Sequence, residues 1–386
     1  MSRAAATPIA TFDDWVDCFR RWQVELGLDL PGLREHCFET RFGPLQSHEI
    51  EFGDFAGRRK WERVMEIPEQ RIRDALERLI AVQGDTELAS VEQQRRLAVT
   101  APSRDDLLNL ARVMTEEMRH GWQMASLLVT HFGASGKIEA QKLLERHAFH
   151  GTRLLGAFNE EVRDWLDFFT YTCFIDRDGK YQLLMLSASA FAPVARSVGP
   201  MLREEAFHLG TGYSGLKRIL RAGRVPVEVI QRTLNKWVPR AFDLFGTDGS
   251  SSAHWAYVWG LKGRVDEARA TTPADRDRLN ETAREQYRRE CVEIVGRLNR
   301  LLPWESPKLY LPDPCFNRQI GRFAGEPYGA DGRLIDDAAY PEYLDRVLPT
   351  EEDRALLADL SEETGWIAPK GPAGLGRETG TFELEK

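Results

Sequence analysis

The sequence predicts an all-α protein built around a four-helix bundle, and the first reason is a short pattern that occurs twice. Glu117 and His120 in TEEMRHGW are matched by Glu205 and His208 in REEAFHLG. Residues three apart share one face of an α-helix, so each pair can present a carboxylate and an imidazole to the same point. Apolar residues recur at helical spacing around both pairs, which places these polar side chains on stripes that face the core.

Polar side chains on core-facing stripes favour a site for two metal ions. An isolated buried carboxylate is costly, so buried charges are usually paired or bound to a metal. The alternative is that each Glu forms a buried hydrogen bond with its own His and no metal is bound. Two further acids in the sequence bear on this choice.

Each Glu-x-x-His pair has an acid upstream at nearly the same distance, which is the second reason for the bundle. Glu87 lies 30 residues before Glu117, and Asp176 lies 29 residues before Glu205. Helix-breaking residues fall near the middle of each interval, at 100–103 and 187–190. At about 1.5 Å per residue, both acids of an antiparallel helix hairpin lie roughly 20 Å from the turn. Two helices with one carboxylate each and two with Glu-x-x-His form the di-iron carboxylate site of a ferritin-like four-helix bundle.

Caps and apolar periodicity predict the other elements in chain order. Thr11 caps a first helix that ends near Gly27, and residues 31–61 are irregular. Pro68 fits the first turn of the next helix, whose apolar stripe continues to Glu87. Ser103 and Asp106 then predict a capping box at the start of a long helix.

The long helix that carries Glu117 is predicted to end at Gly133, and a short helix follows from Ser135. The next segment, FIDRDGKYQ, leaves two interpretations, because Asp-Gly more often marks a turn than a helix interior. A helix is favoured there, because Asp176 shares a helical face with three earlier residues, Trp165, Phe169 and Thr172.

The helix around Glu205 begins either at Pro193 with a kink at Pro200, or at Pro200 itself. After Gly212, two further helices are predicted at about 214–222 and 226–243. Residues 246–263 form a Gly/Ser-rich loop with aromatic residues, and a long charged helix is expected from about Pro273 to Leu302. These features divide the chain into an N-terminal segment, the bundle, a C-terminal extension and a disordered tail, at 1–60, 61–243, 244–370 and 371–386.

Composition excludes several classes of protein. The 386 residues are 42% hydrophobic with a net charge of −8, which argues against disorder and against nucleic acid as the main partner. No apolar run is long enough to span a membrane, and the first residues lack a signal peptide. Five scattered cysteines agree with a cytoplasmic location.

Several segments resemble the oxygenase component of benzoyl-CoA epoxidase, a family related to the catalytic subunit of phenylacetyl-CoA monooxygenase. The segments are QGDTELASVEQQ, TEEMRHGWQM, LLGAFNEEVRDWLDFFTYT, DRDGKYQL and FAPVARSVGPMLREEAFH, and the likeness covers roughly residues 60–240. At Phe207 the benzoyl-CoA enzymes have His, whereas the phenylacetyl-CoA relatives are closer to this chain.

The resemblance implies a cluster of two iron ions with six ligands, Glu87, Glu117, His120, Asp176, Glu205 and His208. It selects Asp176 over Asp178 as a ligand and makes Glu117 and Glu205 catalytic. The implied reaction activates O2 and adds one oxygen atom across an aromatic double bond, giving an epoxide. The implied substrate is an aryl-CoA thioester such as benzoyl-CoA or a close analogue, and ligand types alone do not separate iron from manganese.

Electrons are expected to come from NAD(P)H through a separate reductase, because the chain has no flavin, nicotinamide or iron–sulfur motif. Alternative functions are a di-iron hydroxylase or N-oxygenase on another aromatic substrate, a ferroxidase-type iron-binding bundle, and a metal-free structural partner of another oxygenase. The filled set of six ligand positions disfavours the last, and the large C-terminal extension disfavours a storage bundle. Assembly into a homo-oligomer is also allowed.

Two amides are candidates for substrate contacts. Gln83 lies one turn before Glu87 on the same stripe, and Asn159 lies at the predicted start of the helix that carries Asp176. Both could instead tie helices together, as buried amides commonly do. An apolar wall is expected from Phe168, Phe169 and Phe191. Glu116 and Glu204, next to predicted ligands, are expected either to support those ligands or to lie at the surface.

Overall fold

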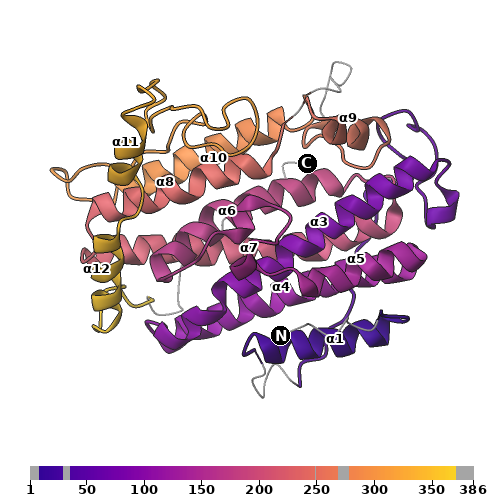
Figure 1. Cartoon of the computed structure of the whole chain (residues 1–386), viewed down its shortest axis with the longest axis horizontal. Helices are drawn as coiled ribbons and strands as arrows, with labels where there is room; N and C mark the ends of the chain where they lie inside the picture. Colours follow the sequence, from indigo (N-terminus) through magenta and orange to yellow (C-terminus); the bar gives the residue numbers. More distant parts are fainter. Residues whose placement is uncertain (1–7, 29–34, 248, 268–277, 371–386) are drawn as a thin grey trace.

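The computed structural model describes residues 8–28, 35–247, 249–267 and 278–370, and the regular elements in these ranges are all helices. Four helices run side by side through the middle of the molecule (Figure 1): α3 (Gln70–Gln94), α4 (Arg104–His131), α6 (Trp165–Leu186) and α7 (Ala192–Ala222). The prediction of an all-α, ferritin-like bundle is confirmed.

The bundle consists of two helix hairpins, as the spacing of the acids predicts. The 3-10 turn η2 (Arg95–Thr100) joins α3 to α4, and a short turn at 187–191 joins α6 to α7. Buried Lys60 holds the second turn, because its Nζ donates to the carbonyls of Ala188 and Ser189 at 2.7 and 2.9 Å. A cation at the C-terminal end of a helix is also favoured by the helix dipole.

Helix α6 runs without interruption through the Asp-Gly sequence, so the helical interpretation of the segment around Asp176 is confirmed. The helix begins where the Asp164 side chain accepts a hydrogen bond from the backbone of Asp167 at 2.8 Å. This cap lies beyond Asn159. The prediction that Asn159 starts this helix is wrong, because Asn159 belongs to a separate 3-10 turn, η4 (Gly156–Asn159).

Helix α7 is continuous through Pro200 and Gly212, so the prediction of a separate helix after Gly212 is wrong. The glycines serve helix packing instead. A Cβ atom at Gly212 would lie 2.5 Å from the backbone nitrogen of Cys173, and one at Gly215 would lie 2.1 Å from the Phe169 ring. Glycine therefore allows α7 to approach α6 closely, and the contact with α6 outweighs the low helix propensity of glycine.

Glycines also allow close packing of the first hairpin, which consists of α3 and α4. A Cβ atom at Gly84 would lie 2.9 Å from Met124, and one at Gly121 would lie 2.5 Å from Leu88. Gly84 therefore lies inside α3 without ending it. Helix α3 itself starts at Gln70, so Pro68 precedes the helix instead of occupying its first turn.

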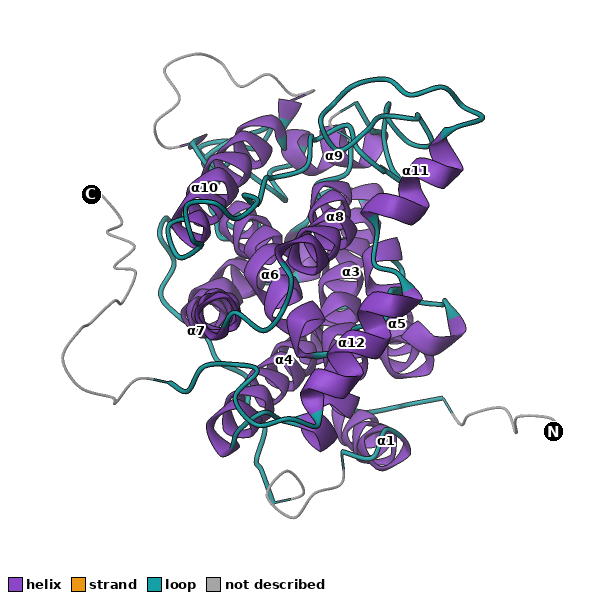
Figure 2. Cartoon of the chain, turned by 90° about the vertical axis from the view of Figure 1, so that its left-hand side faces the viewer, coloured by secondary structure: helices purple, strands orange, loops and turns teal. Residues whose placement is uncertain are grey.

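The peripheral helices cover the bundle on two sides (Figure 2). On one side, α1 (Phe12–Glu25) packs against α4 and α5 (Gly133–Glu145). On the other side, α8 (Val227–Leu244) and α10 (Glu281–Asn299) pack against α6. The described chain also contains α9 (Ser251–Val258), α11 (Tyr340–Val347), α12 (Glu351–Ser361), and the 3-10 turns η1 (Val64–Glu66) and η3 (Ala148–His150).

Several predicted caps and boundaries can be compared with these elements. Thr11 caps α1, as predicted, and in addition forms a complete capping box. Ser103 caps α4, but the Asp106 carboxylate pairs with Arg218 at 2.6 and 2.9 Å instead of completing the predicted box. The buried guanidinium is a stronger partner for this carboxylate than a backbone N–H.

The C-terminal extension differs from the prediction in one element. The segment 246–263 contains helix α9, because the Ser250 side chain accepts from the backbone of Ala253 at 3.2 Å and caps a helix there. The predicted charged helix is present as α10, and the part of that prediction at 273–277 lies outside the described residues. The predicted tail at 371–386 also lies outside them.

One hydrophobic core contains Trp15 from the N-terminal segment, Phe174 from the bundle and Tyr287 from the extension. The segments on both sides of residues 60 and 243 therefore share one core, and the division into domains stays a prediction. Among the described helices, none has the length and apolar character needed to cross a lipid bilayer.

Candidate metal centre

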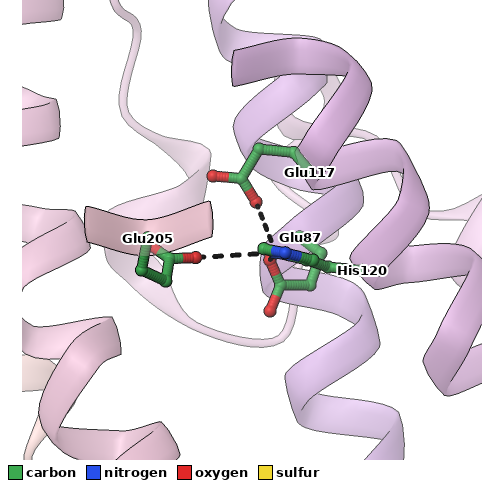
Figure 3. A group of neighbouring side chains, drawn as sticks. All are labelled: Glu87, Glu117, His120 and Glu205. Atoms are coloured by element: carbon green, nitrogen blue, oxygen red, sulfur yellow. Dashed lines mark hydrogen bonds and ion pairs between the residues drawn. The ribbon is translucent and has the colours of Figure 1, made fainter. Parts of the chain in front are cut away.

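The six predicted ligands meet inside the bundle. Each is less than 8% exposed, and they come from all four bundle helices. Their ligand atoms form two groups within which all distances are below 4.8 Å, namely Glu87 with Glu117, His120 and Glu205, and Glu117 with Asp176 and His208. Figure 3 shows the first group, in which the three carboxylates surround the imidazole.

Two of the carboxylates lie between the two imidazoles. One Glu117 oxygen lies 3.8 Å from His120 Nδ1 and the other lies 3.4 Å from His208 Nδ1. The Glu205 oxygens lie 3.5 and 3.4 Å from the same two nitrogens. Each carboxylate therefore presents one oxygen to each imidazole, as a ligand that bridges two metal ions would.

The remaining two acids lie one on each side. Glu87 Oε2 is 3.2 Å from His120 Nδ1, whereas Asp176 groups with His208. The cluster thus has two similar halves. Each half has one imidazole and one acid of its own, and the two halves share Glu117 and Glu205. This differs from two separate Glu–His pairs, because the shortest carboxylate contacts of His120 come from other helices.

The outward nitrogen of each imidazole is held by an acid from the opposite Glu-x-x-His helix. His120 Nε2 lies 2.7 Å from Glu204, and His208 Nε2 lies 3.0 Å from Glu116. Glu116 and Glu204 therefore support the predicted ligands. A carboxylate at the outer nitrogen fixes the ring orientation and directs the other nitrogen towards a metal.

Arginine side chains keep these outer acids ionised. Glu204 accepts from Arg119 Nε at 2.9 and 3.0 Å and from Arg41 Nη1 at 2.9 Å, and Glu116 accepts from Arg112 Nε at 2.8 Å. Burial opposes ionisation of Glu204, but hydrogen bonds from His120 and Arg119 lower the pKa of Glu204 to about 2. The pKa of Glu116 is lowered as well, so both outer acids stay ionised at neutral pH.

Burial and neighbouring charges shift the pKa values of the inner acids in different directions. Burial and the charge of Glu87 raise the pKa of Glu117 to about 7, and burial with the charges of Glu117 and Glu205 raises the pKa of Asp176 well above its usual range. Burial also acts against ionised Glu87, but His120 lowers the pKa of Glu87 to about 2. Four converging carboxylates thus need compensating positive charge.

The donor atoms fit a pair of metal ions. Asp176 Oδ2 and His208 Nδ1 are buried and make no hydrogen bond to a described residue. Such unpaired atoms in a native core need an explanation, and binding to an ion supplies one. Carboxylate and imidazole ligands suit iron and manganese. The cluster is therefore compatible with a di-iron centre.

The clustered acids predict a pH dependence for the metal-free protein. Glu117 keeps its proton in the folded state up to about pH 7, whereas the unfolded chain releases it near pH 4.5. The free energy of unfolding should therefore fall by roughly 2 to 3 kcal/mol as the pH rises through this window. The raised pKa values of His120 and His208 extend the fall above pH 6.5. This fall is measured as the difference between the free energies of urea unfolding of chelator-treated protein at pH 5 and at pH 8.

Metal loading is the control for this prediction. Bound ions displace the protons, so the metal-loaded protein should lose most of the fall between pH 5 and pH 8. Glu117→Gln removes one titrating group and should flatten the curve of the metal-free protein. Equal pH slopes with and without metal would contradict the assignment.

A cavity of about 190 Å³ opens beside the cluster. Its lining includes four predicted ligands, Glu87, Glu117, Asp176 and Glu205. The walls are mostly apolar and include Leu79, Val82, Leu155, Phe158, Ile175, Leu183, Leu186 and Leu244. Further lining residues are polar, among them Asp178, Gln182 and Lys262, which are linked by hydrogen bonds from Lys262 to Gln182 and from Gln182 to Asp178.

The two predicted substrate amides differ in position. Gln83 lines the cavity, and its Nε2 donates to Glu87 at 2.5 Å. Asn159 is not among the lining residues. Its side chain accepts from the backbone of Arg153 and donates to the carbonyls of Arg153 and Leu155, which closes the loop that contains it. Asn159 can therefore affect the cavity through Leu155 and Phe158, which do line it.

The predicted aromatic wall is wrong. Phe168, Phe169 and Phe191 are fully buried, but none lines the cavity. Phe169 packs against Gly215 of α7, and Phe191 packs against His131. These rings fill the contacts between helices, and Phe158 is the phenylalanine that lines the cavity.

Sequence reasoning missed several residues of the site. Tyr171 and Gln182 line the cavity from α6, and Lys262 reaches it from the C-terminal extension. No spacing rule connects Lys262 to the bundle. The outer acids Glu116 and Glu204 were not missed, because each stands next to a predicted ligand in a Glu-Glu doublet and a supporting role was one of the two expected for it.

Comparison with known proteins adds an independent finding. A family model described as phenylacetic acid catabolic protein matches residues 63–303. Benzoyl-CoA oxygenase component B from Aromatoleum evansii is 37% identical over 390 residues, which cover 87% of this chain and 81% of that protein. One of the proteins that make up 1,2-phenylacetyl-CoA epoxidase in Escherichia coli (strain K12) is 22% identical over 193 residues, covering 49% of this chain and 60% of that protein.

Proposed function

The chain belongs to the phenylacetic acid catabolic protein family, and from this premise we propose that it is a di-iron monooxygenase acting on an aryl-CoA thioester. The substrate is benzoyl-CoA or a close analogue, and the product is an epoxide of the aromatic ring. The family membership supports an oxygenase, because both relatives are named as an oxygenase or epoxidase of an aromatic CoA thioester.

The observation that carries the proposal is a cavity lined by four of the predicted ligands. Its volume of about 190 Å³ is of the size that holds one aromatic ring, since an apolar cavity of about 150 Å³ binds benzene. A ring in this cavity would lie directly against Glu117 and Asp176. A ferroxidase needs access for an ion and has no use for an apolar compartment of this size.

Different residues of the chain have different roles in the proposed reaction. When bound, the two iron ions supply the reductive activation of O2. Glu117 and Glu205, which face both imidazoles, would hold both ions, and Glu87, His120, Asp176 and His208 would complete their ligands. The apolar walls exclude water and orient the ring, and such positioning strongly affects rate.

Partner proteins follow from the proposed chemistry. The Aromatoleum relative is named as component B, and so belongs to a system of several components. We propose that a separate reductase transfers electrons from NAD(P)H to this chain. The polar lining residues Asp178, Gln182 and Lys262 suit the polar part of a thioester that extends beyond the ring.

A thioester screen tests the proposal. Iron-loaded protein is incubated with isotopically labelled O2 and with benzoyl-CoA, phenylacetyl-CoA or the free acids, and incorporated label is measured by mass spectrometry. We expect label in at least one thioester after chemical reduction by dithionite, and none with NADPH alone. Multiple turnovers with NADPH and no second protein would refute the reductase requirement. Iron oxidation without label in any aromatic compound would favour the ferroxidase.

A further inference from the structure

Tyr171 is a fully buried tyrosine of α6 that lines the cavity beside the predicted metal centre. Its ring is held perpendicular to the Trp237 ring at a centroid distance of 5.1 Å and nearly perpendicular to the Phe158 ring at 6.5 Å. These contacts are typical of edge-to-face aromatic packing, which restricts ring orientation. The position of the Tyr171 hydroxyl is therefore set by the core.

The hydroxyl of Tyr171 is buried and makes no hydrogen bond to a described residue. The Ser90 hydroxyl lies beside it and already accepts from Gln94 Nε2 at 2.9 Å. A buried polar group without a partner costs about 1 to 3 kcal/mol. Burial and the charge of Asp176 raise the pKa of Tyr171 well above its usual range, so the hydroxyl remains a donor.

Other polar side chains of the cavity each make at least one hydrogen bond. Gln83 donates to Glu87, the Thr86 hydroxyl donates to the Gln83 carbonyl at 2.8 Å, and Gln182 donates to Asp178. Among the lining residues that the structure describes, two buried polar atoms lack a partner, Asp176 Oδ2 and the Tyr171 hydroxyl. The first is an acceptor suited to a metal ion. The second is a donor that needs an acceptor.

We propose that Tyr171 donates a hydrogen bond to the carbonyl oxygen of the bound thioester and so positions the aromatic ring. In an aroyl thioester the carbonyl is bonded directly to the ring, so a ring placed at the predicted ligands brings the carbonyl within a few ångströms of them. Carboxylates that bind metal ions are ionised, so the predicted ligands accept but cannot donate. Tyr171 supplies the donor. This inference rests on the proposed function and makes Tyr171 a determinant of thioester specificity.

The test compares two ligands that differ in the carbonyl. Dissociation constants of benzoyl-CoA and of its S-benzyl thioether, in which CH2 replaces the carbonyl, are measured for wild-type protein and Tyr171→Phe without reductant. Wild-type protein should bind the thioester about 5- to 10-fold more tightly than the thioether, as expected for one net hydrogen bond. Tyr171→Phe should bind both with similar affinity, and the thioether should be bound equally by the two proteins.

Two further measurements separate this role from a structural one. The melting temperature of ligand-free Tyr171→Phe should stay within about 2 °C of wild type, because the hydroxyl has no partner to lose. Ser90→Ala should keep the preference for the thioester. A preference undiminished in Tyr171→Phe, or lost equally in Ser90→Ala, would overturn the inference and leave the proposed function intact. Absence of thioester binding by wild-type protein would overturn both.

Discussion

Replacing Glu117 with alanine is expected to remove both metal ions and to lower oxygenation by more than about a hundredfold. Glu117 presents one oxygen towards each imidazole, so its loss affects both metal positions at once. Even the loss of a group that supports a metal ligand costs about 10- to 100-fold in affinity or activity, and the loss of a shared ligand should exceed that. Iron per chain, measured by mass spectrometry of the purified protein, falls from two towards zero.

Two further kinds of variant complete this experiment: variants of ligands that belong to one metal position only, and a control variant of a nearby acid that is not a predicted ligand. His208→Ala and Glu87→Ala each remove a ligand from one position and should leave about one ion per chain. Asp178→Asn replaces a buried carboxylate two residues from Asp176 that belongs to neither ligand group, and it should retain two ions. Two ions in the Glu117 variant, or a loss in the Asp178 variant, would refute the ligand assignment.

Gln83→Ala is expected to keep two iron ions and the folded state but to lose coupled product formation and release peroxide instead. Gln83 lines the cavity and holds Glu87 through one of its two amide N–H groups, so the other remains available to a substrate. A misplacement of about 1 Å can cost roughly a hundredfold in rate. The ratio of product formed to O2 consumed measures this effect.

The Gln83 result needs two comparisons. Gln83→Met keeps the length of the side chain without its donors, so it separates hydrogen bonding from the filling of space. Asn159→Ala removes the amide that closes the loop of Leu155, and the structure leads us to expect a lower melting temperature with a smaller change in coupling. Wild-type coupling in both Gln83 variants would show that this amide is structural and that the ring is positioned by other residues.

The named relatives and the cluster geometry are separate observations, and both support the proposed oxygenase function. The comparison assigns a family, whereas the structure shows a mostly apolar cavity that the shared carboxylates help to line. A lysine from the C-terminal extension lines this cavity, so the extension contributes to the site as well as to stability. We therefore expect the C-terminal extension to affect substrate choice.

The sequence by itself determined the two helix hairpins and the level at which the six predicted ligands meet. Helical rise and periodicity are local properties, so equal spacing from a turn is enough to bring Glu87 beside Glu117 and Asp176 beside Glu205. Periodicity also outweighed the turn signal of Asp-Gly in α6. Two other kinds of sequence prediction were wrong. One placed Phe169 in the wall of the cavity, and the other ended a helix at Gly212.

Only the tertiary structure decided how the hairpins face one another. The pairing of Glu204 with His120 and of Glu116 with His208 depends on the rotation and separation of α4 and α7, which glycine contacts between neighbouring helices help to set. The cavity and the unpaired hydroxyl of Tyr171 depend on which side chains fill the space between packed helices. These properties arise from contacts between residues distant in the chain, and local periodicity carries no information about them.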